Sequence, residues 1–181
     1  MNIPTTDLLE DLTKRTLQNI KDIELLSDFD ASILNKKEST EKWSALECIA
    51  HLNFYSDFYL PEFDRRIRLS GYTRPSDTFN SGLLGNYFAK IVGPLDGAKK
   101  MKTLKISDPI HSEVDPGTLA KFKEHLMQTL VLLEKASEVN LVKTKTSISI
   151  SKFIKLRLGD GFRVVIYHNQ RHIEQALKAV S

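Results

Sequence analysis

The segment that decides the fold is residues 43–52, WSALECIAHL. Ser44 and Glu47 have the spacing of a capping box, in which the serine hydroxyl accepts from the N3 amide and the glutamate accepts from the cap amide. Trp43 and Cys48 take the positions of a hydrophobic staple, so we expect Cys48 to be a buried packing residue. The segment therefore predicts the start of a helix.

This helix is expected to be the central helix of the molecule. Its apolar side chains occupy most of its faces and continue far along the chain, at Ile49, Leu52, Tyr55, Tyr59, Phe63 and Ile67. Pro61 falls inside the run. Because the apolar spacing continues beyond it, we expect a kink there rather than the end of the helix.

Three more long helices follow from apolar residues at i+3 and i+4 spacing. They are predicted over residues 6–26, from Asp115 (N-cap) and Pro116 (N1) to about 136–140, and from Phe162 to Val180. The stretch 71–115 is rich in Gly and Pro, and a short helix is predicted within it at 83–92. We therefore expect one domain, residues 1–181, that forms an all-α four-helix bundle with a long crossover between helices two and three.

Residues 144–158 are harder to assign. Ile148 and Ile150 alternate with serines, which is typical of a short strand. A lone strand is not stable, and no partner is evident. The prediction is therefore an extended connector that leads through Gly159-Asp160-Gly161 into the last helix.

Composition excludes several classes of protein. The net charge of +3 is too small to indicate a nucleic-acid-binding protein, and the basic cluster Lys99, Lys100, Lys102 and Lys105 is interpreted as a solvated loop. No stretch approaches the ~20 apolar residues of a membrane helix, and residues 1–7 have no signal-peptide pattern. A single cysteine allows no disulfide within the chain, so we expect a reducing, cytoplasmic location.

Histidines provide the candidate chemistry. His168 and His172 are four residues apart on a predicted helix, so their imidazoles project from one face about 6 Å apart along the axis. Such a pair can chelate a divalent metal, although two ordinary, partly exposed histidines have the same spacing. His51 lies in the most apolar helix, where it is either a third ligand or a core histidine bonded to a carbonyl or carboxylate. His111 and His125 are assigned ordinary surface roles.

Two motifs more than a hundred residues apart resemble one known family. Residues 43–52 are similar to the second-helix motif of the DinB-like (DNA-damage-inducible) superfamily, and residues 168–176, HNQRHIEQA, resemble its last-helix signature. The lead-in at 155–160 is also similar. The resemblance implies a four-helix bundle of up-down-down-up topology and a divalent ion, zinc or nickel, bound by His51, His168 and His172.

Three imidazoles leave one coordination position of a divalent ion open, which is typical of catalytic rather than structural sites. Helix geometry places Glu47, Tyr55 and Gln175 where they could support or line the site, although each has a structural explanation. Asn169 follows the first histidine of the last motif, where a metalloprotease needs a glutamate base, so we do not expect proteolysis of that type.

The residues and the resemblance together leave three functional hypotheses open, the last because no catalytic side chain beyond the ligands is evident. The first is an S-transferase that uses a low-molecular-weight thiol on a small-molecule electrophile in stress or detoxification. The second is a metal-dependent hydrolase, and the third is a metal-binding or interaction module without chemistry. We also expect a homodimer, because bundles of this size often pair through an apolar helix face.

Overall fold

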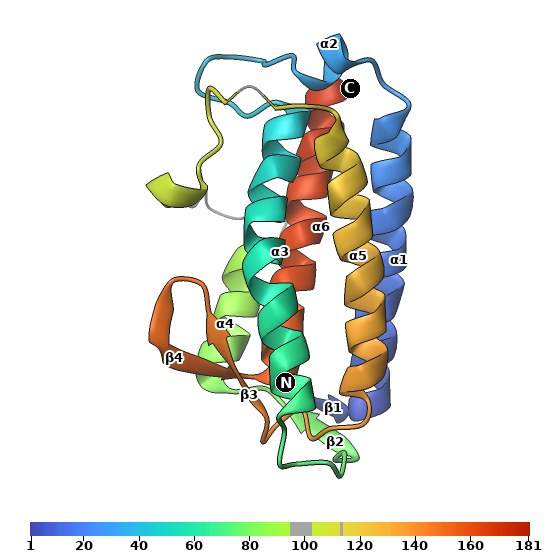
Figure 1. The fold of residues 1–181 in the computed structure, drawn as a ribbon, viewed down its shortest axis with the longest axis vertical. Helices are drawn as coiled ribbons and strands as arrows, with labels where there is room; N and C mark the ends of the chain where they lie inside the picture. The colour runs from blue at the N-terminus through green and yellow to red at the C-terminus, as the bar shows by residue number, and fades with distance from the viewer. Residues whose placement is uncertain (95–102, 113) are drawn as a thin grey trace.

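The computed structural model describes residues 1–94, 103–112 and 114–181. Four long helices lie side by side in it (Figure 1): α1 (Thr5–Ser27), α3 (Ala45–Arg68), α5 (Gly117–Ala136) and α6 (Leu158–Val180). α3 and α1 each pack against both α5 and α6. The predicted helical bundle is confirmed at this level. Among the described helices, none combines the length and apolar character needed to cross a membrane.

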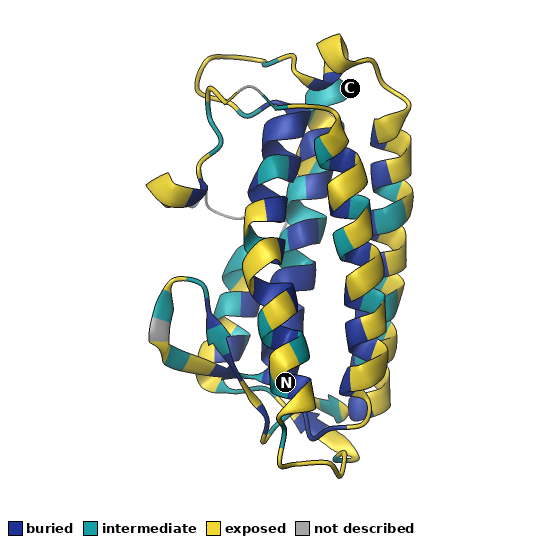
Figure 2. Cartoon of the chain, in the orientation of Figure 1, coloured by how far each residue is buried: buried dark blue, intermediate teal, exposed yellow. Residues whose placement is uncertain are grey.

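The inward faces of the four helices form the core (Figure 2). Its buried apolar residues fall into two clusters, and aromatic rings from facing helices meet in the first, where the centroids of Phe63 and Phe162 are 4.4 Å apart. Both rings are almost fully buried. Each such side chain stabilises the fold by roughly 1.5–3 kcal/mol, so this packing fixes α3 against α6, the two helices that carry the candidate ligands.

The predicted start of α3 is confirmed. Ser44 Oγ accepts from the Glu47 amide at 3.1 Å, and Glu47 Oε2 accepts from the Ser44 amide at 2.8 Å. The helix continues past Pro61 to Arg68, as expected. At α5 the predicted start is early, since the first helical residue is Gly117 and Asp115 Oδ1 accepts from its amide at 2.7 Å.

Short helices and strands lie in the connections between the long helices and before the first of them. The expected short helix is present as α4 (Leu83–Val92), together with α2 (Ala31–Leu34) and a 3₁₀ turn, η1 (Lys105–Ser107). Strand β1 (Asn2–Pro4) pairs antiparallel with β2 (Thr78–Asn80), which brings the start of α1 beside the chain that follows α3. The Asn140 amide donates to the Tyr72 carbonyl at 2.9 Å, so α3 and α5 end close to each other.

The prediction of an extended connector over 144–158 was wrong. The segment is a hairpin of β3 (Lys145–Ile148) and β4 (Ser151–Arg157), so each strand is the partner of the other. The reversal at residues 149–150 has no glycine or proline to signal it, so the alternation looks like one strand. Side chains of α3 hold the hairpin, because Glu62 Oε1 accepts from the Ser147 amide at 2.9 Å and Tyr59 Oη from the Ser149 amide at 3.3 Å.

The buried carboxylate of Asp160 anchors the crossover to the start of α6. This helix begins at Leu158, so Gly159 and Gly161 lie inside it and not, as predicted, before it. Asp160 accepts from the Gly82 amide at 2.8 Å, from Ser81 Oγ at 2.5 Å and from Arg163 at 3.0 Å. A buried ion pair is tolerated when its remaining lone pairs are hydrogen-bonded. This network sets where α4 lies against α6.

Candidate metal centre

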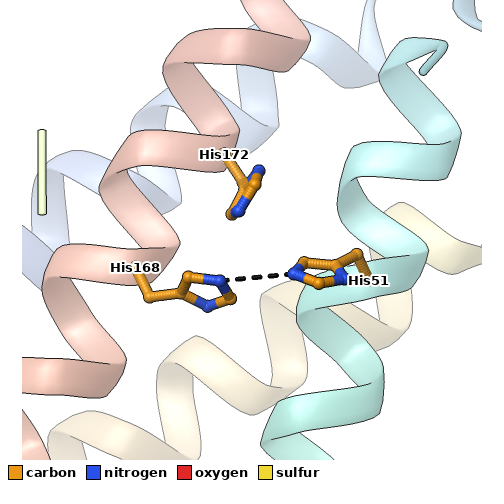
Figure 3. A group of neighbouring side chains, drawn as sticks. All are labelled: His51, His168 and His172. Carbon is orange, nitrogen blue, oxygen red and sulfur yellow. Dashed lines mark hydrogen bonds between the residues drawn. The ribbon is translucent and has the colours of Figure 1, made fainter. Parts of the chain in front are cut away.

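The structure brings the three predicted histidines together. His51 projects from α3 toward His168 and His172 on the facing α6 (Figure 3). One ring nitrogen of each lies within 4.8 Å of the others, and Nε2 of His51 is 3.3 Å from Nε2 of His168. Among the described residues this is the one group of three or more potential ligands with that spacing.

The ring of His51 is held by backbone. Its Nδ1 donates to the Ser107 carbonyl at 2.7 Å, and the side chain is buried. Because Nδ1 carries the proton, Nε2 presents its lone pair toward His168. The Trp43 ring lies beside that of His51, with centroids 4.7 Å apart, and its indole N–H donates to Asp108. The turn at 105–108 therefore fixes the tautomer and the direction of this imidazole.

His172 has an equivalent support from its own helix. Its Nδ1 is 3.0 Å from Oε1 of Gln175, so the ring donates there and leaves Nε2 free. A carbonyl or amide oxygen on the distal nitrogen is the usual support of a metal-ligating histidine. Two of the three imidazoles thus show the second hydrogen bond that a metal site requires.

Burial lowers the pKa of all three histidines. Desolvation is the main cause for each, and the charges of His51 and Arg171 add to it at His172, whose pKa is lowered to about 3. The pKa of His168 lies well below its ordinary value for the same reasons, with His172 as a further neighbour. Burial also lowers the pKa of His51, but the hydrogen bond to the Ser107 carbonyl and the charge of Asp108 raise it in part. Neutral imidazoles at pH 7 are the form that binds a metal.

The donor set fits a divalent ion. Zinc binds imidazole nitrogen at about 2.0–2.1 Å in tetrahedral geometry, which separates two ligand nitrogens by about 3.4 Å. The 3.3 Å between the Nε2 atoms of His51 and His168 matches that separation. Three neutral nitrogens from two helices that pack against each other lie within 4.8 Å of one another, so they could hold one ion.

A cavity of about 300 Å³ opens beside the histidines. All three line it, and the rest of its wall comes from α3, α4, α6, the β3–β4 hairpin and residues 103–104. Most of this wall is apolar, and its polar side chains are Tyr55, Tyr59, Thr103, Ser149 and Arg171. A small, largely apolar cavity with a few polar groups is the usual form of a ligand site.

The three supporting residues suggested by helix geometry have different positions. Gln175 contacts His172, as described above. Tyr55 lines the cavity, with its ring 4.9 Å from that of His51 and its hydroxyl 3.1 Å from Ser107 Oγ. Glu47 instead caps α3 and binds Lys37 and the His111 amide through Oε1. It holds the 103–111 segment, which carries Ser107.

Sequence reasoning missed Ser107, which lies 56 residues from His51 in a segment without a periodic pattern. It also gave Trp43 and Arg171 no place at the site, although both stand inside the two quoted motifs. Trp43 could have been predicted at the site from its position directly before Ser44, the N-cap of the helix that carries His51.

The other two histidines, Cys48 and Lys105 are not part of the three-histidine site. His125 joins α5 to α3, with Nδ1 2.9 Å from Asn53 Oδ1 and Nε2 3.3 Å from Asp57, so it is a helix-to-helix contact rather than a surface residue. His111 is exposed, with φ of 64°. Cys48 is fully buried, which raises the pKa of its thiol to about 12. Lys105 is exposed in η1, and Lys99, Lys100 and Lys102 lie outside the described residues.

A helical bundle whose facing helices carry three convergent histidines defines a class of candidate metalloproteins. The family model of the DinB superfamily matches residues 7–176, so the chain belongs to that superfamily. Neither the curated proteins nor the solved structures contain a match to the chain.

Proposed function

We propose that the protein is a metal-dependent enzyme, a thiol S-transferase that acts on small electrophiles. The observation that carries the proposal is the position of His51, His168 and His172 in the wall of an apolar cavity rather than inside a closed core. A zinc or nickel ion held there would lower the pKa of a thiol or water at its open position. The co-substrate would be a low-molecular-weight thiol.

The surrounding residues have roles that suit this chemistry. Ser107 and Gln175 bind Nδ1 of two imidazoles, which leaves Nε2 of each free for a metal ion. Apolar side chains of α4 and the hairpin line much of the cavity, and an apolar wall strengthens electrostatic interactions within it. The Tyr55 hydroxyl, 3.1 Å from Ser107 Oγ, would serve as a proton donor at the edge of the site.

The cavity argues for the transferase over the two alternatives. A hydrolase that uses metal-bound hydroxide normally has a general base, and no Asp or Glu is among the described residues that line the cavity. A non-catalytic module has no need of a cavity beside the ion.

The proposal extends to the whole molecule. We take residues 1–181 as one domain with the long helices in up-down-down-up order, supported by the bond that places the ends of α3 and α5 together. We also propose a cytoplasmic homodimer. Nearly complete exposure of Leu83 on α4 and Phe153 on the hairpin supports the dimer, and light scattering coupled to size exclusion would test it.

The experiment has two stages. Elemental analysis of the purified protein should show about one zinc or nickel per chain, which is lost in the double variant His168→Ala, His172→Ala. The loaded protein should then conjugate bacillithiol, mycothiol or glutathione to a model electrophile faster than the double variant does. Metal binding without a metal-dependent rate with any of the three thiols would reject the transferase. Turnover of ester or amide substrates without thiol would favour the hydrolase.

A further inference from the structure

Arg171 is the one side chain that is charged at pH 7 among the described residues that line the cavity. Around it the wall is formed by apolar side chains of α4, the hairpin and α6, including Phe88, Ile148 and Leu156. No carboxylate of the described residues lines the cavity. The electrostatic character of this space is therefore positive, before any metal ion is added to it.

The guanidinium of Arg171 is only partly satisfied. Its Nη1 donates to the Ile91 carbonyl at 3.0 Å, in the last turn of α4. A guanidinium has five N–H donors, and no ion pair joins Arg171 to any described carboxylate. A half-buried charge with no counter-charge in an apolar cavity is unfavourable, and a ligand carboxylate would remove that penalty through charge-assisted hydrogen bonds.

We propose that the cavity takes small amphiphilic carboxylates, with the carboxylate on Arg171 and the apolar body between α4 and the β3–β4 hairpin. This assignment names the substrate class of the enzyme proposed above and rests on that function. Arg171 directly precedes His172 on α6, so a carboxylate bound to it keeps the ligand at the wall that carries the three histidines. The cavity of about 300 Å³ limits the class to small molecules.

The competing explanation is that Arg171 only caps the C-terminal end of α4 through the Ile91 carbonyl. That role uses one donor, and it predicts no preference for an anionic ligand. Binding measurements separate the two explanations.

The test compares 4-phenylbutyrate with its neutral analogue 4-phenylbutanamide by isothermal titration calorimetry, on zinc-loaded and on metal-free protein. We expect the carboxylate to bind about tenfold more tightly than the amide in both forms. In Arg171→Gln the two affinities should agree within about twofold. Lys178→Gln removes the same charge from an exposed position on the same helix and should keep the tenfold preference.

Three results would overturn the assignment: equal affinities in the unaltered protein, no binding of either probe, or a preference that survives Arg171→Gln. A preference that vanishes when zinc is removed would also overturn it, because the metal would then hold the anion. Should Arg171→Gln not fold, Arg171→Lys, which lacks the planar fork, is expected to weaken the preference at least about threefold. Elemental analysis of the same samples reports separately on the metal site. Failure of the proposed function can therefore be distinguished from failure of the carboxylate assignment.

Discussion

At the residue scale, His51 and His172 each donate a hydrogen bond from Nδ1, but to different kinds of acceptor. His51 depends on a backbone carbonyl 56 residues away, whereas His172 depends on the side chain of Gln175 in the next turn of its own helix. A side chain can be replaced without moving the backbone. Gln175 is therefore the position where the contribution of this second hydrogen bond can be measured.

Gln175→Ala should weaken zinc binding by about 10–100-fold, because Nδ1 of His172 loses its acceptor and the ring its fixed tautomer. Stability of the metal-free fold should hardly change, since Gln175 is exposed. Competition against a chromophoric chelator measures the zinc Kd. Gln128→Ala, on an exposed position of α5, is the matched control and should bind zinc normally. An unchanged Kd in Gln175→Ala would show that the contact does not support a ligand.

At the element scale, α4 and the hairpin form walls of the cavity, and each is held by a small number of contacts. α4 approaches α6 closely at Gly85, where an added Cβ would lie 2.3 Å from the carboxyl of Asp160. Gly71, by contrast, has nothing within 4 Å of that position. The two glycines therefore form a natural pair for comparison.

Gly85→Ala should destabilise the protein by about 1–3 kcal/mol, because the buried Asp160 network has no room to move aside. Gly71→Ala should leave stability within about 0.5 kcal/mol of the parent protein. Urea denaturation followed by circular dichroism measures both. Equal stability of the two variants would mean that α4 shifts freely along α6.

The hairpin is fastened to α3 through Glu62, whose carboxylate accepts from the Ser147 amide and from Arg65 and Arg66. These hydrogen bonds outweigh desolvation and lower the pKa of Glu62 to about 2. Because the folded pKa lies below the unfolded value near 4.5, the contribution is present above pH 4.5. It is lost as the pH falls through the window from 4.5 to 2.

Glu62→Gln should therefore reduce the loss of stability between pH 4.5 and 2 by roughly 2–3 kcal/mol. Asp64→Asn is the control on the same helix. The pKa of Asp64 is also lowered, by Arg68 and Lys135, but its side chain is more exposed and does not touch the hairpin. Denaturant titrations at several pH values measure how the free energy of unfolding of each variant changes with pH. Parallel curves for the parent protein and Glu62→Gln would contradict the proposed anchor.

At the scale of the whole molecule, the sequence predicts what depends on local pattern. The capping box at Ser44, the i,i+4 pair on α6 and the apolar faces of the long helices are all properties of short segments, and the structure has them. The sequence does not predict features that depend on contacts between residues far apart in the chain. Ser107 reaches His51 through a turn without periodicity, and the hairpin turn at Ser149 and Ile150 has neither glycine nor proline.

The candidate metal site spans α3 and α6, because α3 supplies one histidine and α6 two. Binding to the folded state alone stabilises a protein by mass action, by about 2.7 kcal/mol when free zinc is 100 times its Kd. For a chain of 181 residues that corresponds to a rise in Tm of roughly 5–10 °C.

His168→Ala should abolish this rise in Tm, measured by calorimetry with and without zinc. His125→Gln is the control, since it removes the contact of α5 with Asn53 and Asp57 and should lower Tm while it keeps the zinc-dependent rise. A variant that is merely less stable therefore behaves differently from one that has lost a ligand. If zinc raised the Tm of His168→Ala as much as that of the parent protein, the ion would be bound outside the α3–α6 seam, and the three histidines would be a neutral buried cluster.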